Sequence, residues 1–107
     1  MYPSDPCSTP PELRAIRTEI DEVDLALVGL IARRVALAHR TAPLKAAHGL
    51  AFRNPQREAG LVRRAAELAK ERGIDPEPVR AIFWQLVDLS HASVRAAVVR
   101  EEGARRE

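Results

Sequence analysis

Two cationic side chains, Arg34 and Lys45, have the spacing needed to hold an anion between them. They lie eleven residues apart on a predicted long helix, and this separation of three turns, roughly 16 Å, returns both to nearly the same face. The positions between them on this face are the small residues Ala38, Thr41 and Ala42, which leave a hollow. Two cations at the ends of a hollow suit a compact ligand that carries two negative charges.

Arg34 also occupies a position at which the three- and four-residue spacing of apolar residues in this helix predicts a hydrophobic residue. An arginine there can bind an anionic ligand, pair with a carboxylate of another helix, or extend its charged end to solvent. Because Lys45 lies on nearly the same face of the helix, the first of these roles, binding of an anionic ligand, is favoured. The apolar positions step by three and four residues, as in a helix that buries one stripe: Leu13, Ile16, Ile20, Val23, Leu27, Leu30 and Leu37.

A third cation on the same helix, Arg17, indicates that a second copy of the chain takes part. It lies seventeen residues before Arg34, roughly 25 Å along the helix axis, so the two cannot contact one ligand within a single chain. A second copy packed antiparallel along the apolar stripe would bring Arg17 to the hollow and supply core that a lone 107-residue chain lacks. We therefore expect a homodimer whose sites use residues of both chains.

Arg57 and Glu58 belong to the first turn of the next predicted helix and can close the hollow from the other side. The ordinary interpretation stays open as well. Glutamate in a first turn favours the helix dipole, and arginine is common on protein surfaces.

The elements that must position these side chains are three predicted helices, and the fold class is all-α. The Ala-, Leu-, Arg- and Glu-rich composition favours helix over sheet. The long first helix begins at Leu13, and Pro43 should kink or end it just before Lys45. Asn54-Pro55 is typical of a helix start, and Gly73 of the end of that second helix.

The third helix starts at Asp75-Pro76, which repeats the capping residue followed by proline. One face carries its inward positions, which are Val79, Ile82, Phe83, Leu86, Val87, Ser90, Val94 and Ala97. Around one helical domain of residues 13–99, we expect a flexible proline-rich segment at 1–12 and a charged tail at 100–107 that frays.

The charge distribution favours an anionic partner. Residues 33–73 carry a net charge of +7 and the rest of the chain −5, which leaves +2 overall. A basic segment suits an anionic small molecule or a nucleic acid, and solvated helix faces are the ordinary alternative. We expect no nucleic-acid partner, because the helices show no recognised DNA-binding turn and no aromatic stacking platform. A helical interaction module without activity is the non-enzyme alternative.

The cysteine and histidine content and the hydropathy of the chain bear on disulfides, metal sites and membrane spans. The single cysteine, Cys7, cannot form an internal disulfide, and no apolar run approaches the roughly 20 residues of a membrane span. We therefore expect a cytoplasmic protein without membrane contact. His39, His48 and His91 lack metal-ligand spacing with other ligand types, so no metal site is expected.

The combined pattern resembles the all-α (AroQ-class) chorismate mutases over about residues 13–98. The matching stretches are Arg17-x6-Asp24, Ala32-Arg33-Arg34 with Leu37-Ala38, Lys45, Asn54-Pro55-Gln56-Arg57-Glu58, and Phe83 through Ser90. The resemblance implies an intertwined three-helix homodimer with two sites and no cofactor. It also implies a pericyclic rearrangement of chorismate to prephenate, the step that leads from the shikimate pathway toward aromatic amino acids.

The resemblance also implies residue roles. Arg34 and Arg17 of the partner subunit would bind the two substrate carboxylates, with Arg57 assisting, and Ser90 would lie close to one of them. Lys45 would donate to the ether oxygen of the bond that breaks.

Further implied roles concern the ring. Glu58 would accept a hydrogen bond from the substituent at C4, and Asn54 stands where the family often has aspartate near that group. Asn54 cannot carry the charge of aspartate, although it caps a helix equally well. The reaction needs no covalent intermediate and no proton transfer.

Val94 departs from the family pattern, which usually has glutamine or glutamate at this position to donate to the ether oxygen. Losing such a donor typically costs about 2.7–4 kcal/mol of transition-state stabilisation. The alternatives are therefore a slow mutase, a 4-amino-4-deoxychorismate mutase of an antibiotic pathway, or an enzyme activated by a partner protein. An isochorismate pyruvate lyase shares the implied fold and is a further alternative.

Overall fold

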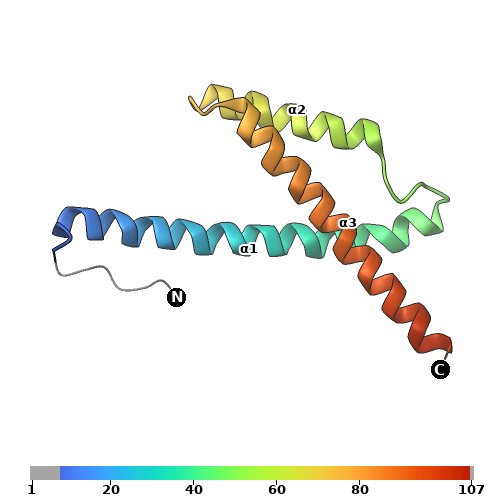
Figure 1. The fold of residues 1–107 in the computed structure, drawn as a ribbon. Coiled ribbons are helices and arrows are strands. Elements are labelled where there is room, and N and C mark those ends of the chain that lie inside the picture. Colours follow the sequence, from blue (N-terminus) through green and yellow to red (C-terminus); the bar gives the residue numbers. More distant parts are fainter. Residues whose placement is uncertain (1–7, 107) are drawn as a thin grey trace. The chain divides into compact units, whose positions relative to one another are not determined.

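The computed structural model describes residues 8–106, which form three α-helices (Figure 1). They are α1 (Pro11–Ala47), α2 (Pro55–Glu71) and α3 (Pro76–Arg106), and this range contains no strand. The all-α prediction is confirmed, whereas the intertwined homodimer stays a prediction. Most of the expected flexible segment, together with Cys7, lies outside the described residues. The described chain falls into two units, residues 8–32 and residues 33–106.

The first unit contains the N-terminal part of α1, which begins two residues before the expected start at Leu13. Pro11 and Glu12 are already helical, and the Pro10 carbonyl accepts hydrogen bonds from the backbone N–H groups of Leu13 and Arg14, both at 3.1 Å. The prolines do not prevent this start, because the first N–H groups of a helix have no partner within it.

The apolar positions of this first unit are exposed, and no residue of α1 is buried. Exposure ranges from 38% at Leu13 to 60% at Leu30. We call this set the α1 stripe; its members are Leu13, Ile16, Ile20, Val23, Leu27 and Leu30. The side chains of the α1 stripe are therefore open to solvent in a single chain.

In the second unit, both predicted ends of α2 and the predicted start of α3 are confirmed. The Asn54 side chain accepts a hydrogen bond from the Arg57 N–H at 3.1 Å. Gly73 follows α2 with a φ of 73°, a conformation that glycine adopts without strain. The Asp75 carboxylate accepts from the Glu77 N–H at 3.0 Å, at the start of α3.

The apolar core of the described chain lies on α2 and α3. Its buried side chains are Val62, Ala65, Ala66, Ala69, Val87 and Val94, and the buried polar residues are Glu58 and Ser90. The prediction of an inward face on α3 is wrong for Ile82, which is 53% exposed. Val79, Phe83 and Leu86 are half-buried, and Val79 and Phe83 line a groove together with residues of α2.

Two helices continue past the residues at which the sequence predicts an end or fraying. Pro43 lies inside α1, which continues to Ala47 and keeps Lys45 in its last turn. Proline removes one N–H donor from the helix, and the other hydrogen bonds of this turn hold it. The charged tail expected to fray from Arg100 is helical as far as Arg106, consistent with its alanine, glutamate and arginine content.

Side chains fix the C-terminal part of α1 against α3 within the second unit. His39 Nε2 and Ser93 Oγ form a hydrogen bond of 2.8 Å, and Arg34 makes further bonds to α3. In the part of the chain that the structure describes, none of the helices combines the length and the hydropathy that a membrane span requires.

Candidate active site

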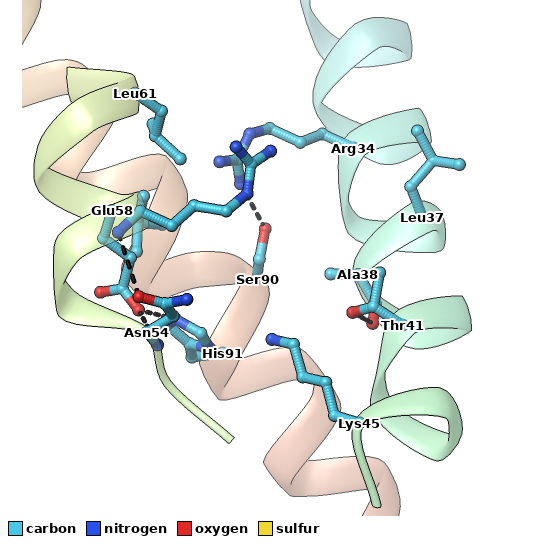
Figure 2. Close-up of a pocket in the computed structure, with 12 residues that line it drawn as sticks. Arg34, Leu37, Ala38, Thr41, Lys45, Asn54, Glu58, Leu61, Ser90 and His91 are labelled. Carbon is cyan, nitrogen blue, oxygen red and sulfur yellow. Dashed lines mark hydrogen bonds and ion pairs between the residues drawn. The ribbon is translucent and has the colours of Figure 1, made fainter. Parts of the chain in front are cut away.

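A pocket of about 340 Å³ opens among α1, α2 and α3 in the second unit (Figure 2). This size is close to the lower end of small-molecule sites, which begins near 300 Å³. The lining residues are Arg34, Leu37, Ala38, Thr41, Lys45, Asn54, Arg57, Glu58, Leu61, Val87, Ser90 and His91. The pocket therefore gathers six of the eight candidate site residues, which are Arg34, Lys45, Asn54, Arg57, Glu58 and Ser90.

Arg34 is half-buried, and α3 holds its guanidinium in place. Its Nη1 donates to Ser90 Oγ at 2.9 Å and to the Leu86 carbonyl at 3.3 Å. Both bonds use the same nitrogen, so the rest of the planar fork is left for a carboxylate. Ser90 is buried and acts as a support for this arginine.

Lys45 extends from the last turn of α1 toward the other helices (Figure 2). Its Nζ donates to the Phe52 carbonyl at 3.0 Å. An ammonium group has three donors, so the Phe52 contact positions Lys45 and leaves donors for a ligand. Arg34 and Lys45 line the same pocket, as their helical spacing predicted.

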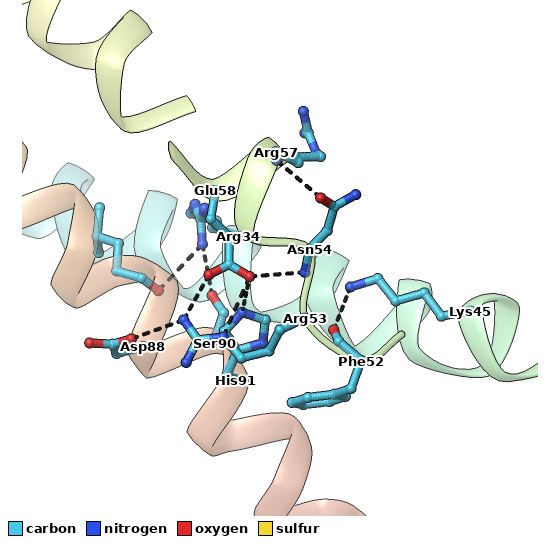
Figure 3. A network of polar contacts seen from close by, with 11 residues as sticks. Arg34, Lys45, Phe52, Arg53, Asn54, Arg57, Glu58, Asp88, Ser90 and His91 are labelled. Atoms are coloured by element: carbon cyan, nitrogen blue, oxygen red, sulfur yellow. Dashed lines mark hydrogen bonds and ion pairs between the residues drawn. The ribbon is translucent and has the colours of Figure 1, made fainter. Parts of the chain in front are cut away.

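The start of α2 supplies Asn54, Arg57 and Glu58. Asn54 Oδ1 is engaged by the Arg57 N–H in the helix cap, while the Arg57 side chain is exposed and directed away from the Glu58 network (Figure 3). The cap thus fixes the backbone of the first turn of α2, from which the side chains of Arg57 and Glu58 point in different directions.

Glu58 is buried, and three groups converge on its carboxylate (Figure 3). Arg53 Nη2 lies 2.7 Å from Oε1, while the Asn54 N–H and His91 Nε2 lie 3.2 and 3.1 Å from Oε2. The hydrogen bond from Arg53 lowers the pKa of Glu58, and the bond with His91 lowers it further, against the opposing effect of burial. Glu58 is therefore a carboxylate, so His91 Nε2 must be the protonated, donating nitrogen.

Sequence reasoning missed the roles of Arg53, His91 and the Phe52 carbonyl. Arg53 precedes the α2 cap, and no local rule pairs it with Glu58. The spacing of the histidines tests His91 only as a metal ligand, but it follows Val87 by four residues and therefore shares the inward face of α3. The Phe52 ring stacks at a tilt on His91, with ring centroids 5.2 Å apart, and helps to hold the imidazole in place.

Chemically, three cations and one carboxylate line this pocket. Arg34, Lys45 and Arg57 are suited to bind anionic oxygens, and Glu58 is suited to accept a hydrogen bond. Nothing in this lining set resembles a nucleophile paired with a base, so the arrangement favours binding and electrostatic stabilisation over covalent chemistry.

Residues 16–94 match the family described as chorismate mutase type II. A protein named chorismate mutase from Methanocaldococcus jannaschii is 35% identical over 81 residues, which cover 76% of this chain and 82% of that protein.

The chain belongs to the chorismate mutase type II family. The matched range includes every residue that lines the pocket, together with Arg17 and Val94. The predicted resemblance is therefore confirmed.

Other relatives carry two different names. A T-protein from Enterobacter agglomerans is 32% identical over 82 residues, 77% of this chain, but the chain spans only 22% of the T-protein. A 4-amino-4-deoxychorismate mutase from Streptomyces venezuelae is 36% identical over 64 residues, 60% of this chain and 62% of that protein. Similarity within the chorismate mutase type II family therefore does not by itself choose the substrate.

The two other candidate residues do not line this pocket. Arg17 lies on α1 in the first unit. Val94 is buried and lines a smaller cavity of about 30 Å³ that also contacts Ala38, Lys45, Phe52 and His91. Val94, at which the sequence departs from the resemblance, thus lines the same small cavity as Lys45.

Proposed function

We propose that this chain is a chorismate mutase that rearranges chorismate to prephenate in a site completed by a second copy. The observation that carries this proposal is the placement of Arg34, Lys45 and Arg57 around one pocket that also contains an anionic Glu58. Chorismate carries two carboxylates and a hydroxyl, which this set of side chains complements.

In the proposed mechanism, Arg34 and Arg57 hold the substrate carboxylates with Arg17 of the partner subunit, and Ser90 fixes the direction of Arg34. Lys45 donates to the ether oxygen as the C–O bond breaks. The site then holds the enolpyruvyl arm over the ring and places a cation where negative charge grows. No proton transfer is needed.

Incubation of the purified chain with chorismate tests this function. We expect chorismate to disappear with formation of an equal amount of prephenate, measured by absorbance and chromatography. Release of pyruvate from isochorismate, with no prephenate from chorismate, would instead establish a lyase. Turnover of neither of these substrates, nor of 4-amino-4-deoxychorismate, would contradict the assignment of enzyme activity.

Two apolar surfaces of the chain, an exposed stripe and a groove, support the proposal that a second copy binds. The first is the exposed α1 stripe. The second is a groove of about 510 Å³ that shares Arg34, Arg57 and Leu61 with the pocket. Its apolar lining consists of Leu61, Ala65, Leu68, Ala69, Ile74, Val79 and Phe83. We propose that the α1 stripe of the partner subunit covers this groove and thereby brings its Arg17 to the site.

Sedimentation at micromolar concentration should therefore show a dimer. Ile20→Glu should shift the sedimenting species to a monomer with reduced helix content, because it places a charge in the buried interface. Thr18→Glu is the matched control, since residue 18 lies on the opposite side of the helix, and it should remain dimeric. A folded wild-type monomer would contradict the shared-site proposal.

The cytoplasmic location and the activating partner protein stay predictions.

A further inference from the structure

We propose that Arg53 and His91 are positioning residues that prepare Glu58 for an uncharged hydroxyl, and that the site therefore selects hydroxyl over ammonium at C4 of the substrate ring. This inference rests on the proposed function and on the role that the family resemblance implies for Glu58, which is to accept a hydrogen bond from the C4 substituent. It goes further, because it assigns roles to Arg53 and His91 and decides between two substrates whose enzymes are both similar to this chain.

The first step concerns the hydrogen-bonding capacity of Glu58. Oε2 already receives the Asn54 N–H at 3.2 Å, His91 Nε2 at 3.1 Å and a longer contact from Arg53 Nε at 3.5 Å. Oε1 receives Arg53 Nη2 at 2.7 Å. Since a carboxylate oxygen has two acceptor sites, one site on Oε1 is left for the substrate. A hydroxyl group, with its single donor, fits this one site.

The second step concerns charge. The negative charge of Glu58 is already matched by the guanidinium of Arg53 in an ion pair of 2.7 Å. Asp88 also contacts Arg53, at 3.4 Å, but its side chain is 66% exposed whereas that of Glu58 is 9% exposed. Solvent screens the exposed contact more strongly, so Arg53 acts mainly on Glu58.

An ammonium group would consequently meet no uncompensated anion in this pocket. The charged lining residues other than Glu58 are Arg34, Lys45 and Arg57, all cationic. A substrate with two carboxylates and a hydroxyl adds two negative charges and no cation to this positively charged lining. Its amino analogue is protonated at neutral pH, adds a cation and leaves the pocket positively charged. The hydroxyl substrate is therefore favoured by the whole set of charges, and Arg53 is the cation that contacts Glu58 directly.

The role of His91 is to keep Glu58 in this position. Its side chain is 16% exposed, packs on the Phe52 ring and approaches the carboxylate from α3. Together with Arg53 and the Asn54 N–H, it prevents the Glu58 side chain from rotating toward a cation in the pocket.

The test compares kcat/KM for chorismate and 4-amino-4-deoxychorismate in wild type and in paired variants. Wild type should prefer chorismate by about tenfold, the effect expected of one unbalanced charge in a partly exposed site. Arg53→Gln retains a donor without the charge and should lower this preference by about threefold to fivefold. Arg53→Lys retains the charge and should retain the preference. His91→Phe should lower the preference for chorismate, whereas His91→Gln, which keeps a hydrogen-bond donor, should retain it.

Circular dichroism and sedimentation will show whether each variant keeps its fold. A wild-type preference for the amino substrate overturns the inference, as does an unchanged preference in folded Arg53→Gln. These outcomes are separate from failure of the proposed function, which is turnover of neither substrate by wild type. A general loss of activity that affects both substrates equally assigns Arg53 and His91 a merely structural role and also overturns the inference.

Discussion

Replacing Arg34 with alanine should lower kcat/KM for chorismate on the order of 10³-fold, because it removes a preorganised carboxylate clamp from a half-buried site. Ser90 and the Leu86 carbonyl hold one nitrogen of the guanidinium, so the free enzyme already presents the rest of the fork to the ligand. Steady-state kinetics would measure the loss. Arg33→Ala is the matched control, since Arg33 is exposed and does not line the pocket, and it should change kcat/KM little.

The same variant tests whether two chains build one site. Arg17→Ala should be inactive alone, and mixing it with Arg34→Ala should recover about a quarter of wild-type activity, because random exchange makes half of the dimers hybrids with one intact site each. Failure to recover activity despite demonstrated subunit exchange would count against a contribution from Arg17 of the partner subunit.

Val94→Gln should raise kcat/KM for chorismate by about 10- to 100-fold, which is part of what a lost transition-state donor costs. Val94 is buried in the small cavity that also contacts Lys45. A glutamine amide there can add a second donor beside the Lys45 ammonium and stabilise the developing charge on the ether oxygen.

The opposing effect is the cost of burying an amide without a partner in a tight cavity. Val94→Leu controls for the added volume without a donor and should not raise activity. Turnover of Val94→Gln that is unchanged or reduced, with the dimer folded, would mean that the site is not a mutase site lacking one hydrogen bond.

The parts of the fold that were predictable from sequence depend on local chemistry. The Asn54 cap and Gly73 each act on backbone groups a few residues away, so residue type and order are enough to predict them. Pro43 shows the limit of the same approach. A local rule predicts the loss of one hydrogen bond, but whether the helix continues depends on all the bonds of that turn.

The candidate site also has a part that could be predicted from local sequence and a part that could not. Arg34 and Lys45 share one helix, so helical periodicity places them on one face. The contact between His91 and Glu58 joins residues that are 33 positions apart, and it exists only because α3 packs against α2. Glu58 shows this most clearly. Its position in the first turn indicates a favourable interaction with the helix dipole or a ligand contact, and it does not indicate the burial and the ion pair with Arg53 that the structure shows.

The uncovered α1 stripe has a consequence for how this protein maintains its folded state. In a single chain α1 buries no residue, and helices in water draw most of their stability from tertiary packing. If a second copy provides that packing, folding and association form one equilibrium, and the free energy of unfolding depends on protein concentration. Dilution would then deplete the folded chain itself, and the cellular abundance of the protein would set the fraction of chains that can catalyse.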